Sequence, residues 1–145
     1  MRITVLSDYS LRVLMYLAAC PERLVTIQEI ASAYQISENH LMKVVHGLAK
    51  SGFVETVRGR GGGMRLAKPA HNIPIGAVLR VSEEDFNLVE CFGPSDTCRI
   101  TKVCRLKRVF QRALQAYLSE LDRWTIADVV ARPNLLLDAL GIDET

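Results

Sequence analysis

The chain has 145 residues, of which 49% are hydrophobic and 23% charged, and its net charge is +2. This composition is typical of a folded domain with its own core and excludes a disordered or collagen-like chain. No stretch approaches the roughly 20 apolar residues that span a bilayer, so we expect a cytoplasmic protein without a membrane partner. Residues 1–72 carry +4 and residues 73–145 carry −2, which indicates that the first half contacts nucleic acid.

The first predicted element is a helix that begins at Ser7 or Asp8, either of which could cap it. Apolar residues recur along it at three- and four-residue steps, at Leu6, Tyr9, Val13, Tyr16 and Leu17. The segment ending at Cys20 also resembles a lipoprotein signal peptide, but charged and polar residues interrupt the apolar stretch of roughly 7–15 residues that such a peptide needs. We therefore predict a helix, with Cys20 as a buried small residue or a helix-end residue rather than a metal ligand.

Two short helices are predicted next, with a tight turn between them. Thr26 and Glu29 have the spacing of a capping box at the start of the first helix, and Ser37 can cap the second. The apolar face of the second helix is formed by Leu41, Val44, Val45 and Leu48. This order of elements predicts a helix-turn-helix. The polar side of the second helix offers groups that can meet bases or phosphates, and we predict DNA contacts from Ser37, Asn39, His40 and Lys43.

A predicted β-hairpin follows, because residues 53–57 and 64–66 alternate toward strand on either side of a glycine-rich basic run. Such a run can also cradle a nucleotide phosphate, but no Gly-Lys-Ser/Thr follows it and it leads into a strand instead of a helix. We therefore interpret the hairpin as the wing of a DNA-binding domain. Arg60 at its tip is suited to a minor groove, and Arg58 and Arg65 to the DNA backbone.

Three cysteines lie within fourteen residues of one another, at Cys91, Cys98 and Cys104, beyond a short helix that Pro74 can begin. The C-x6-C-x5-C spacing is wider than the C-x2-C knuckle of common zinc fingers, so zinc fits it less well. Thiolates also suit iron–sulfur clusters, and a wide loop with turn residues between its cysteines fits a bulky cluster better than one small ion. A disulfide between two of the cysteines is the alternative, although nothing indicates a secreted protein.

The segment beyond the last cysteine predicts a long helix with an unusually broad apolar face. This face consists of Leu106, Val109, Phe110, Ala113, Leu114, Tyr117, Leu118 and Leu121. Little of the chain remains to cover it, so we predict that it forms the interface of a homodimer. Residues 125–128 have the pattern of another short helix, which Pro133 is expected to end.

Together these elements predict a mainly α fold with a small β-hairpin wing, in which a winged helix-turn-helix domain is joined to a long dimerisation helix. The expected divisions are a DNA-binding domain over residues 1–80, a cluster-binding loop over 81–105, and a dimerisation helix with the C-terminal segment over 106–145. An enzyme is not expected, because no nucleophile–base pair or paired carboxylates can be assigned.

Four stretches of the chain carry a resemblance to a known family: residues 8–43, 58–66, 91–107 and 121–128. With their paired features of a three-cysteine loop and a Gly-Gly wing, they resemble the winged-helix iron–sulfur regulators that include IscR-type and NsrR-type proteins. The resemblance covers nearly the whole chain. It is closer to the NsrR type, because IscR-type proteins carry a histidine where this chain has Lys107.

The resemblance implies a homodimeric transcriptional repressor of nitric-oxide-detoxification genes that binds a near-palindromic operator in double-stranded DNA. It implies an iron–sulfur cluster, with [4Fe–4S] favoured and [2Fe–2S] possible, held by Cys91, Cys98, Cys104 and a non-cysteine ligand. For that ligand it points to Asp8 of the opposite subunit, although an aspartate there is also an ordinary cap or first-turn residue. Two alternatives stay open: an IscR-like sensor of cluster supply, and a small iron–sulfur electron-transfer protein, which would not need a basic wing.

Overall fold

The computed structural model describes residues 2–142. Its elements are, in chain order, α1 Val5–Ala19, α2 Ile27–Tyr34, α3 Glu38–Lys50, β1 Val54–Val57, β2 Gly63–Leu66, α4 Ile75–Ser82, α5 Arg105–Asp122, α6 Ile126–Val129 and α7 Pro133–Ala139, with 3-10 turns η1 Ala70–Asn72 and η2 Glu90–Phe92. In the part of the chain described, no helix is long and apolar enough to cross a membrane.

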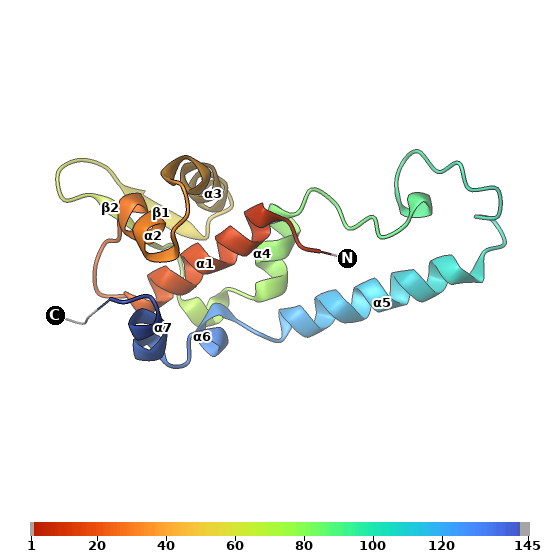
Figure 1. Ribbon diagram of the computed structural model, residues 1–145. Coiled ribbons are helices and arrows are strands. Elements are labelled where there is room, and N and C mark those ends of the chain that lie inside the picture. The colour runs from red at the N-terminus through yellow and green to blue at the C-terminus, as the bar shows by residue number, and fades with distance from the viewer. Residues whose placement is uncertain (1, 143–145) are drawn as a thin grey trace.

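Helix α1 is the centre of the core. It contacts α3, α4, α6, α7 and β2, and Figure 1 shows it running between the helix-turn-helix on one side and α6 and α7 on the other. Four of its hydrophobic side chains are at most 2% exposed, namely Val13, Leu14, Tyr16 and Leu17. The C-terminal helices belong to the same core, since Ile126 and Leu137 are buried in it.

The helix-turn-helix forms as its local signals predict. The hydroxyl of Thr26 accepts from the Glu29 N–H, and that of Ser37 from the His40 N–H, each at 3.2 Å, while Gln35 makes the turn between the helices with a φ of 54°. Helix α3 buries the predicted face of Leu41, Val44, Val45 and Leu48. Because this face is buried, the opposite side of α3 is exposed to solvent.

The predicted capping box at α2 forms only in its first half. The Glu29 carboxylate does not return to the helix start; it accepts hydrogen bonds from Arg23 and from the Tyr16 hydroxyl. The Arg23 hydrogen bond holds the pKa of Glu29 below its ordinary value. Burial, followed by the bond to Glu29, raises the pKa of Tyr16 well above its ordinary value. The carboxylate therefore ties α1 to the segment before α2.

Two other expectations at helix ends were wrong. Thr4 caps α1, and its hydroxyl accepts from the Ser7 N–H at 3.2 Å. Ser7 instead lies buried within the first turn, 2.7 Å from the Ser82 hydroxyl of α4, and Asp8 is the next residue of that turn. Pro133 does not only follow α6 but begins a further helix, α7, because its fixed backbone suits a first helical position.

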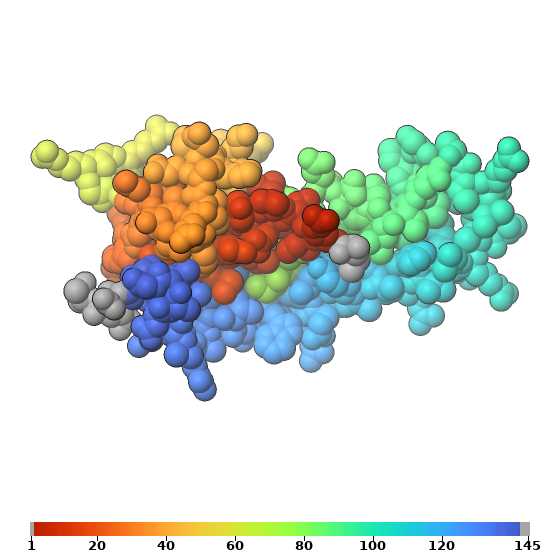
Figure 2. Space-filling view, viewed as in Figure 1, coloured from red at the N-terminus to blue at the C-terminus, as the bar shows by residue number. Residues whose placement is uncertain are grey.

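The wing is a two-stranded antiparallel hairpin attached to the body through one backbone bridge. Strands β1 and β2 pair in register from Val54 with Leu66 to Val57 with Gly63. Val25 and Met64 exchange N–H···O=C bonds of 2.8 and 3.0 Å. In the space-filling view of Figure 2 the hairpin protrudes from one end of the body.

At the other end of the molecule an arm protrudes, consisting of the segment from residue 83 to 104 and α5 (Figures 1 and 2). Helix α5, which is described throughout, has no buried residue. Its last turn is fixed to α4 by Arg80, whose two guanidinium nitrogens contact the Asp122 carboxylate at 2.6 and 2.7 Å. After α5 the chain rejoins the body, where the Ile75 N–H donates to the Trp124 carbonyl oxygen at 2.8 Å.

The wing attachment leaves no room for a side chain at Gly63, which generates a stability prediction. A Cβ there would lie 2.7 Å from the Val25 carbonyl oxygen, and a backbone atom cannot move aside cheaply. Gly63→Ala should therefore lower the free energy of unfolding by about 1–3 kcal/mol. Gly47 of α3 has no atom within 4 Å of such a Cβ, so Gly47→Ala should raise it by about 0.5–1 kcal/mol. Urea midpoints measure both, and shifts of the same sign would contradict this packing.

Candidate DNA interface and cluster site

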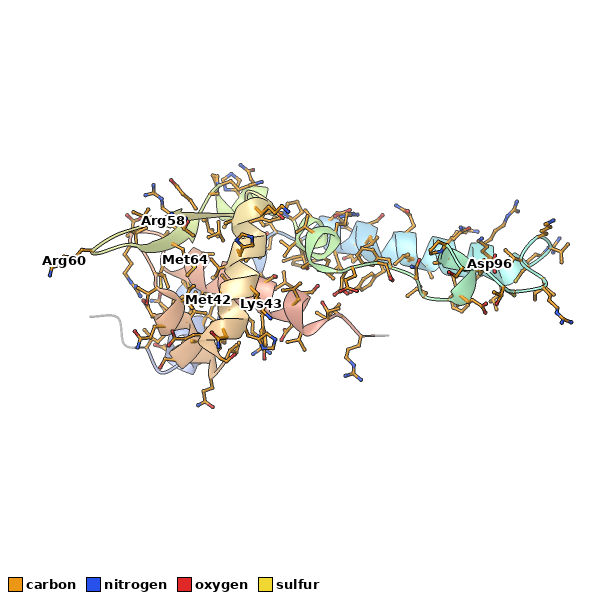
Figure 3. The ribbon with its side chains drawn as sticks, turned by 90° about the horizontal axis from the view of Figure 1, so that it is seen from above. Met42, Lys43, Arg58, Arg60, Met64 and Asp96 are labelled. Carbon is orange, nitrogen blue, oxygen red and sulfur yellow. The ribbon has the colours of Figure 1, made fainter. Side chains whose placement is uncertain are left out.

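Helix α3 and the wing lie on the same side of the molecule (Figures 1 and 3). The four residues predicted to contact DNA from α3 are all exposed, namely Ser37, Asn39, His40 and Lys43. Ser37 is engaged as the helix cap, and the His40 ring packs edge-on against Tyr9 with centroids 5.6 Å apart. Asn39 and Lys43 therefore keep side chains free to reach outward on one face.

The wing presents its arginines at different places. Figure 3 shows Arg60 at the outermost point of the hairpin and Arg58 closer to the body. Gly59 and Gly61 on either side of Arg60 have φ values of +99° and +73°, which side chains rarely adopt, so the tip depends on glycine. Arg65 contacts Glu55 of the neighbouring strand at 3.0 Å. Arg58 and Arg60 are thus the wing cations farther from acidic partners.

The three cysteines line one cavity of about 250 Å³ between the loop and the start of α5. Its wall is largely apolar, and besides the cysteines it consists of Val89, Glu90, Ile100, Leu106, Lys107 and Phe110. The four cysteines of the chain form no disulfide. Among residues 2–142 no three Cys, His, Asp or Glu groups converge closely enough for a single metal ion. Three thiols around an apolar cavity fit a larger inorganic group better than one ion.

Helix α5 adds an electrostatic feature to this cavity. Cys104 is the residue at its N-cap, and no side chain hydrogen-bonds to that end of the helix. The N–H groups and the positive end of the helix dipole favour negative charge near this end. Lys107 in the cavity wall acts in the same direction, and four further basic residues lie within five positions of Cys104 in the sequence, namely Arg99, Lys102, Arg105 and Arg108. The surroundings therefore suit a donor set that is negatively charged.

Two carboxylates that the motif analysis did not assign hold the loop together. Asp96 accepts from the Cys98 N–H and from the Thr101 hydroxyl, each at 3.0 Å. Glu90 accepts from the Thr97 N–H at 3.1 Å and from its hydroxyl. The first arrangement has a sequence signal, because an aspartate two residues before an N–H often makes such a turn. Asp96 thus fixes the backbone of Cys98 directly. Glu90, which precedes Cys91, bonds to Thr97, which precedes Cys98, and so holds the two cysteine positions together.

Asp8 is not among the residues that line this cavity. Its carboxylate contacts Arg12 at 2.9 Å, one turn further along α1, and both side chains are about two-fifths exposed. The Arg12 guanidinium also lies over the rings of Tyr9 and Tyr34. Within one protomer the structure therefore does not bring Asp8 to the three cysteines.

One exposed residue of α3 was missed by reasoning from the sequence. Met42 is 55% exposed, and Figure 3 shows it beside Lys43 on the outward side of the helix. Helical spacing was the available signal, because Met42 follows Asn39 by three residues.

Comparisons with known proteins show the family of the chain. The model of the Rrf2 family, described as an iron-dependent transcriptional regulator, matches residues 3–132. The HTH-type transcriptional regulator NsrR of Bacillus licheniformis is 52% identical over 90% of this chain and 92% of its own length. That of Bacillus subtilis is 49% identical over 99% of this chain and 100% of its own length.

Solved structures show the same architecture. IscR of T. potens has a TM-score of 0.74 at 25% identity, covering 90% of this chain and 87% of its own. CymR, the global cysteine regulator of B. subtilis, has a TM-score of 0.74 at 25% identity, covering 90% and 97%. The predicted fold, mainly helical with a winged helix-turn-helix, is confirmed.

Proposed function

The chain belongs to the Rrf2 family of transcriptional regulators, and we propose that it is a repressor whose affinity for its operator depends on an iron–sulfur cluster that reacts with nitric oxide. The predicted resemblance to NsrR-type regulators is confirmed by relatives at 49% and 52% identity over most of the chain. DNA binding and transcriptional regulation follow from this membership. The nature of the cluster and the signal are the proposed parts.

The observation that supports the cluster is the single cavity lined by Cys91, Cys98 and Cys104. Three thiolates would hold the group there, with [4Fe–4S] favoured over [2Fe–2S] by the resemblance. When bound, the cluster supplies iron with a high affinity for nitric oxide. The thiolates of the loop and of Cys104 at the start of α5 would then be joined through one group, so the loop would be tied to the helix.

The arm connects the cysteine loop to the part of the molecule that carries the DNA-binding face. One end of α5 carries Cys104, and the other end is fixed to α4 through Arg80 and Asp122. Without bonds from the thiolates to the cluster, the loop would no longer be tied to the start of α5, although its own hydrogen bonds, such as those of Asp96, would remain. Operator affinity changes only if the two states bind DNA differently. We therefore infer that the cluster-loaded state is the one that binds the operator.

Regulators of this family bind DNA and typically act as dimers, and we propose that α5 forms the dimer interface. Leu106 and Val109 on this helix are 56% and 58% exposed, and the helix buries no residue in its own protomer. A second copy would cover the apolar face and place two α3 helices about one turn of DNA apart on a near-palindrome.

We further propose that Asp8 of the second protomer is the fourth ligand. The carboxylate is accessible at the start of α1, and its Arg12 partner is a surface ion pair that contributes little to stability. A carboxylate is a harder and more labile ligand of iron than a thiolate. Its exchange would leave one iron accessible, which suits a site that must react with a small gas molecule.

The dimer proposal is tested by charge on the apolar face. Phe110→Glu should raise the dimer dissociation constant at least about a hundredfold, because burying an unpaired carboxylate costs several kcal/mol. Ser119→Glu adds the same charge on the opposite face of α5 and should leave the dimer intact. Light scattering at micromolar concentration decides between them. A cluster-loaded wild-type chain that is monomeric there would contradict the interface.

The ligand proposal is tested by separating the carboxylate from its ion pair. Asp8→Ala should change the absorption and electron-paramagnetic spectra of the cluster and speed its loss several-fold. Arg12→Ala removes the same ion pair but keeps the carboxylate, so its spectra should match the wild type. If both variants only lose stability and both keep the wild-type spectra, Asp8 is a structural residue of α1.

The switch is tested by operator binding before and after nitric oxide. The cluster-loaded protein should lose at least about tenfold in affinity on exposure, a coupling of roughly 1.4 kcal/mol or more. Cys98→Ser should bind weakly under both conditions, whereas Cys20→Ser, which changes a cysteine outside the cavity, should respond like the wild type. Equal affinities before and after would refute control by nitric oxide, and tighter binding by the cluster-free protein would support the IscR-like alternative.

A further inference from the structure

Met42 is a large apolar side chain on the outward face of the recognition helix. The buried face of α3 is Leu41, Val44, Val45 and Leu48. On the opposite side, exposed polar residues repeat at helical spacing, namely Asn39, Lys43, His46 and Lys50. Met42 lies beside this row, 55% exposed. By helical angle it is closer to the middle of the row than His40, which was predicted to contact DNA.

The charges around Met42 identify its partner class. Lys43 follows Met42 on α3, about 100° further around the helix, and Arg58 and Arg60 of the wing lie on the same side of the molecule (Figure 3). A protein or lipid-tail partner that covered Met42 would have to take these cations out of water, which is costly. The phosphates of a DNA duplex neutralise such cations, and α3 and the wing together form a DNA-reading face.

The chemistry of the major groove narrows the contact to one group. Every base edge there presents hydrogen-bond donors or acceptors, and the only apolar group among them is the C5-methyl of thymine. The thioether side chain of methionine is flexible and polarisable, so it adapts to such a methyl group. We propose that Met42 packs against the C5-methyl of one thymine in each operator half-site and thereby selects a T·A pair at that position.

The neighbouring residue extends this to a short sequence preference. Asn39 precedes Met42 by three residues, a rise of about 4.5 Å along the helix, which is close to the roughly 3.4 Å between stacked base pairs. An asparagine recognises adenine through two hydrogen bonds. The two side chains would therefore meet the same or adjacent base pairs, and we expect an A·T-rich step under the first two turns of α3.

This inference rests on the proposed function, because it needs an operator. That operator is first selected from randomised duplexes with the cluster-loaded wild-type protein. Each thymine of a half-site is then replaced by deoxyuridine, which removes the methyl group and keeps the base pairing. One position should show about fourfold weaker binding, the factor that corresponds to about 0.8 kcal/mol for one buried carbon.

The variants then assign that methyl group to Met42. Met42→Ala should bind the thymine operator more weakly by a similar or larger factor and should no longer distinguish thymine from deoxyuridine at this position. Met42→Leu keeps an apolar side chain and should retain the distinction. Alanine, leucine and methionine are all good helix formers, and equal thermal unfolding would show that α3 is intact.

Arg60→Ala is the control variant. It should lose affinity for DNA but keep the preference for thymine over deoxyuridine. It should weaken binding to all sequences and lower the salt slope by about one, while the ratio between thymine and deoxyuridine stays unchanged. If no thymine shows a methyl effect, or if Met42→Ala leaves that effect intact, the inference is overturned while the proposed function stands. If the cluster-loaded protein selects no sequence, the proposed function and the inference both fail.

Discussion

The junction between α4 and α5 is the constraint on which the arrangement of the molecule depends. The Arg80 guanidinium holds both oxygens of Asp122 there and keeps the pKa of that carboxyl below its ordinary value. Gly76 leaves the necessary space, because a Cβ at this position would overlap the Asp122 carboxylate. Since α5 buries no residue beyond this junction, the direction in which the arm leaves the body is set by these contacts.

The direction of the arm sets the relative position of the cysteine cavity and the DNA-reading face, which do not touch. The cysteine cavity lies at the far end of α5, and α3 with the wing lies on the body (Figure 1). Within one protomer, a change at the cavity would reach α3 through the arm and its attachment to the body, and in the proposed dimer also through the second protomer packed on α5. In a dimer, a small rotation of α5 at the junction becomes a larger displacement between two recognition helices, and DNA at fixed half-site spacing is sensitive to that displacement.

The sequence predicted those features of the fold that depend on neighbouring residues. The Ser37 cap and the buried face of α3 are set within one helix, and the wing by its own strands and glycines. The cap of α1 was assigned wrongly, because Ser7 is engaged by Ser82, 75 residues away, and no local pattern reveals such a contact. The spacing of the cysteines indicated their loop, but the role of Asp96 in shaping it depends on a folded turn. Met42 was missed because the contacts predicted for the exposed side of α3 were all polar residues.

One long stretch of the chain contributes no buried residue to the apolar core, and this bears on how such proteins diverge. No apolar residue between Leu79 and Ile126 is buried, in a stretch that the structure describes throughout. Within one protomer, substitutions in this stretch open no cavity in the buried core, although Phe86 and Leu121 pack against its edge. Over evolutionary time, the sensing chemistry can therefore change in one lineage and persist in another while the DNA-reading domain remains folded. The arm is the part of the molecule in which new signals can be acquired at little risk to the scaffold.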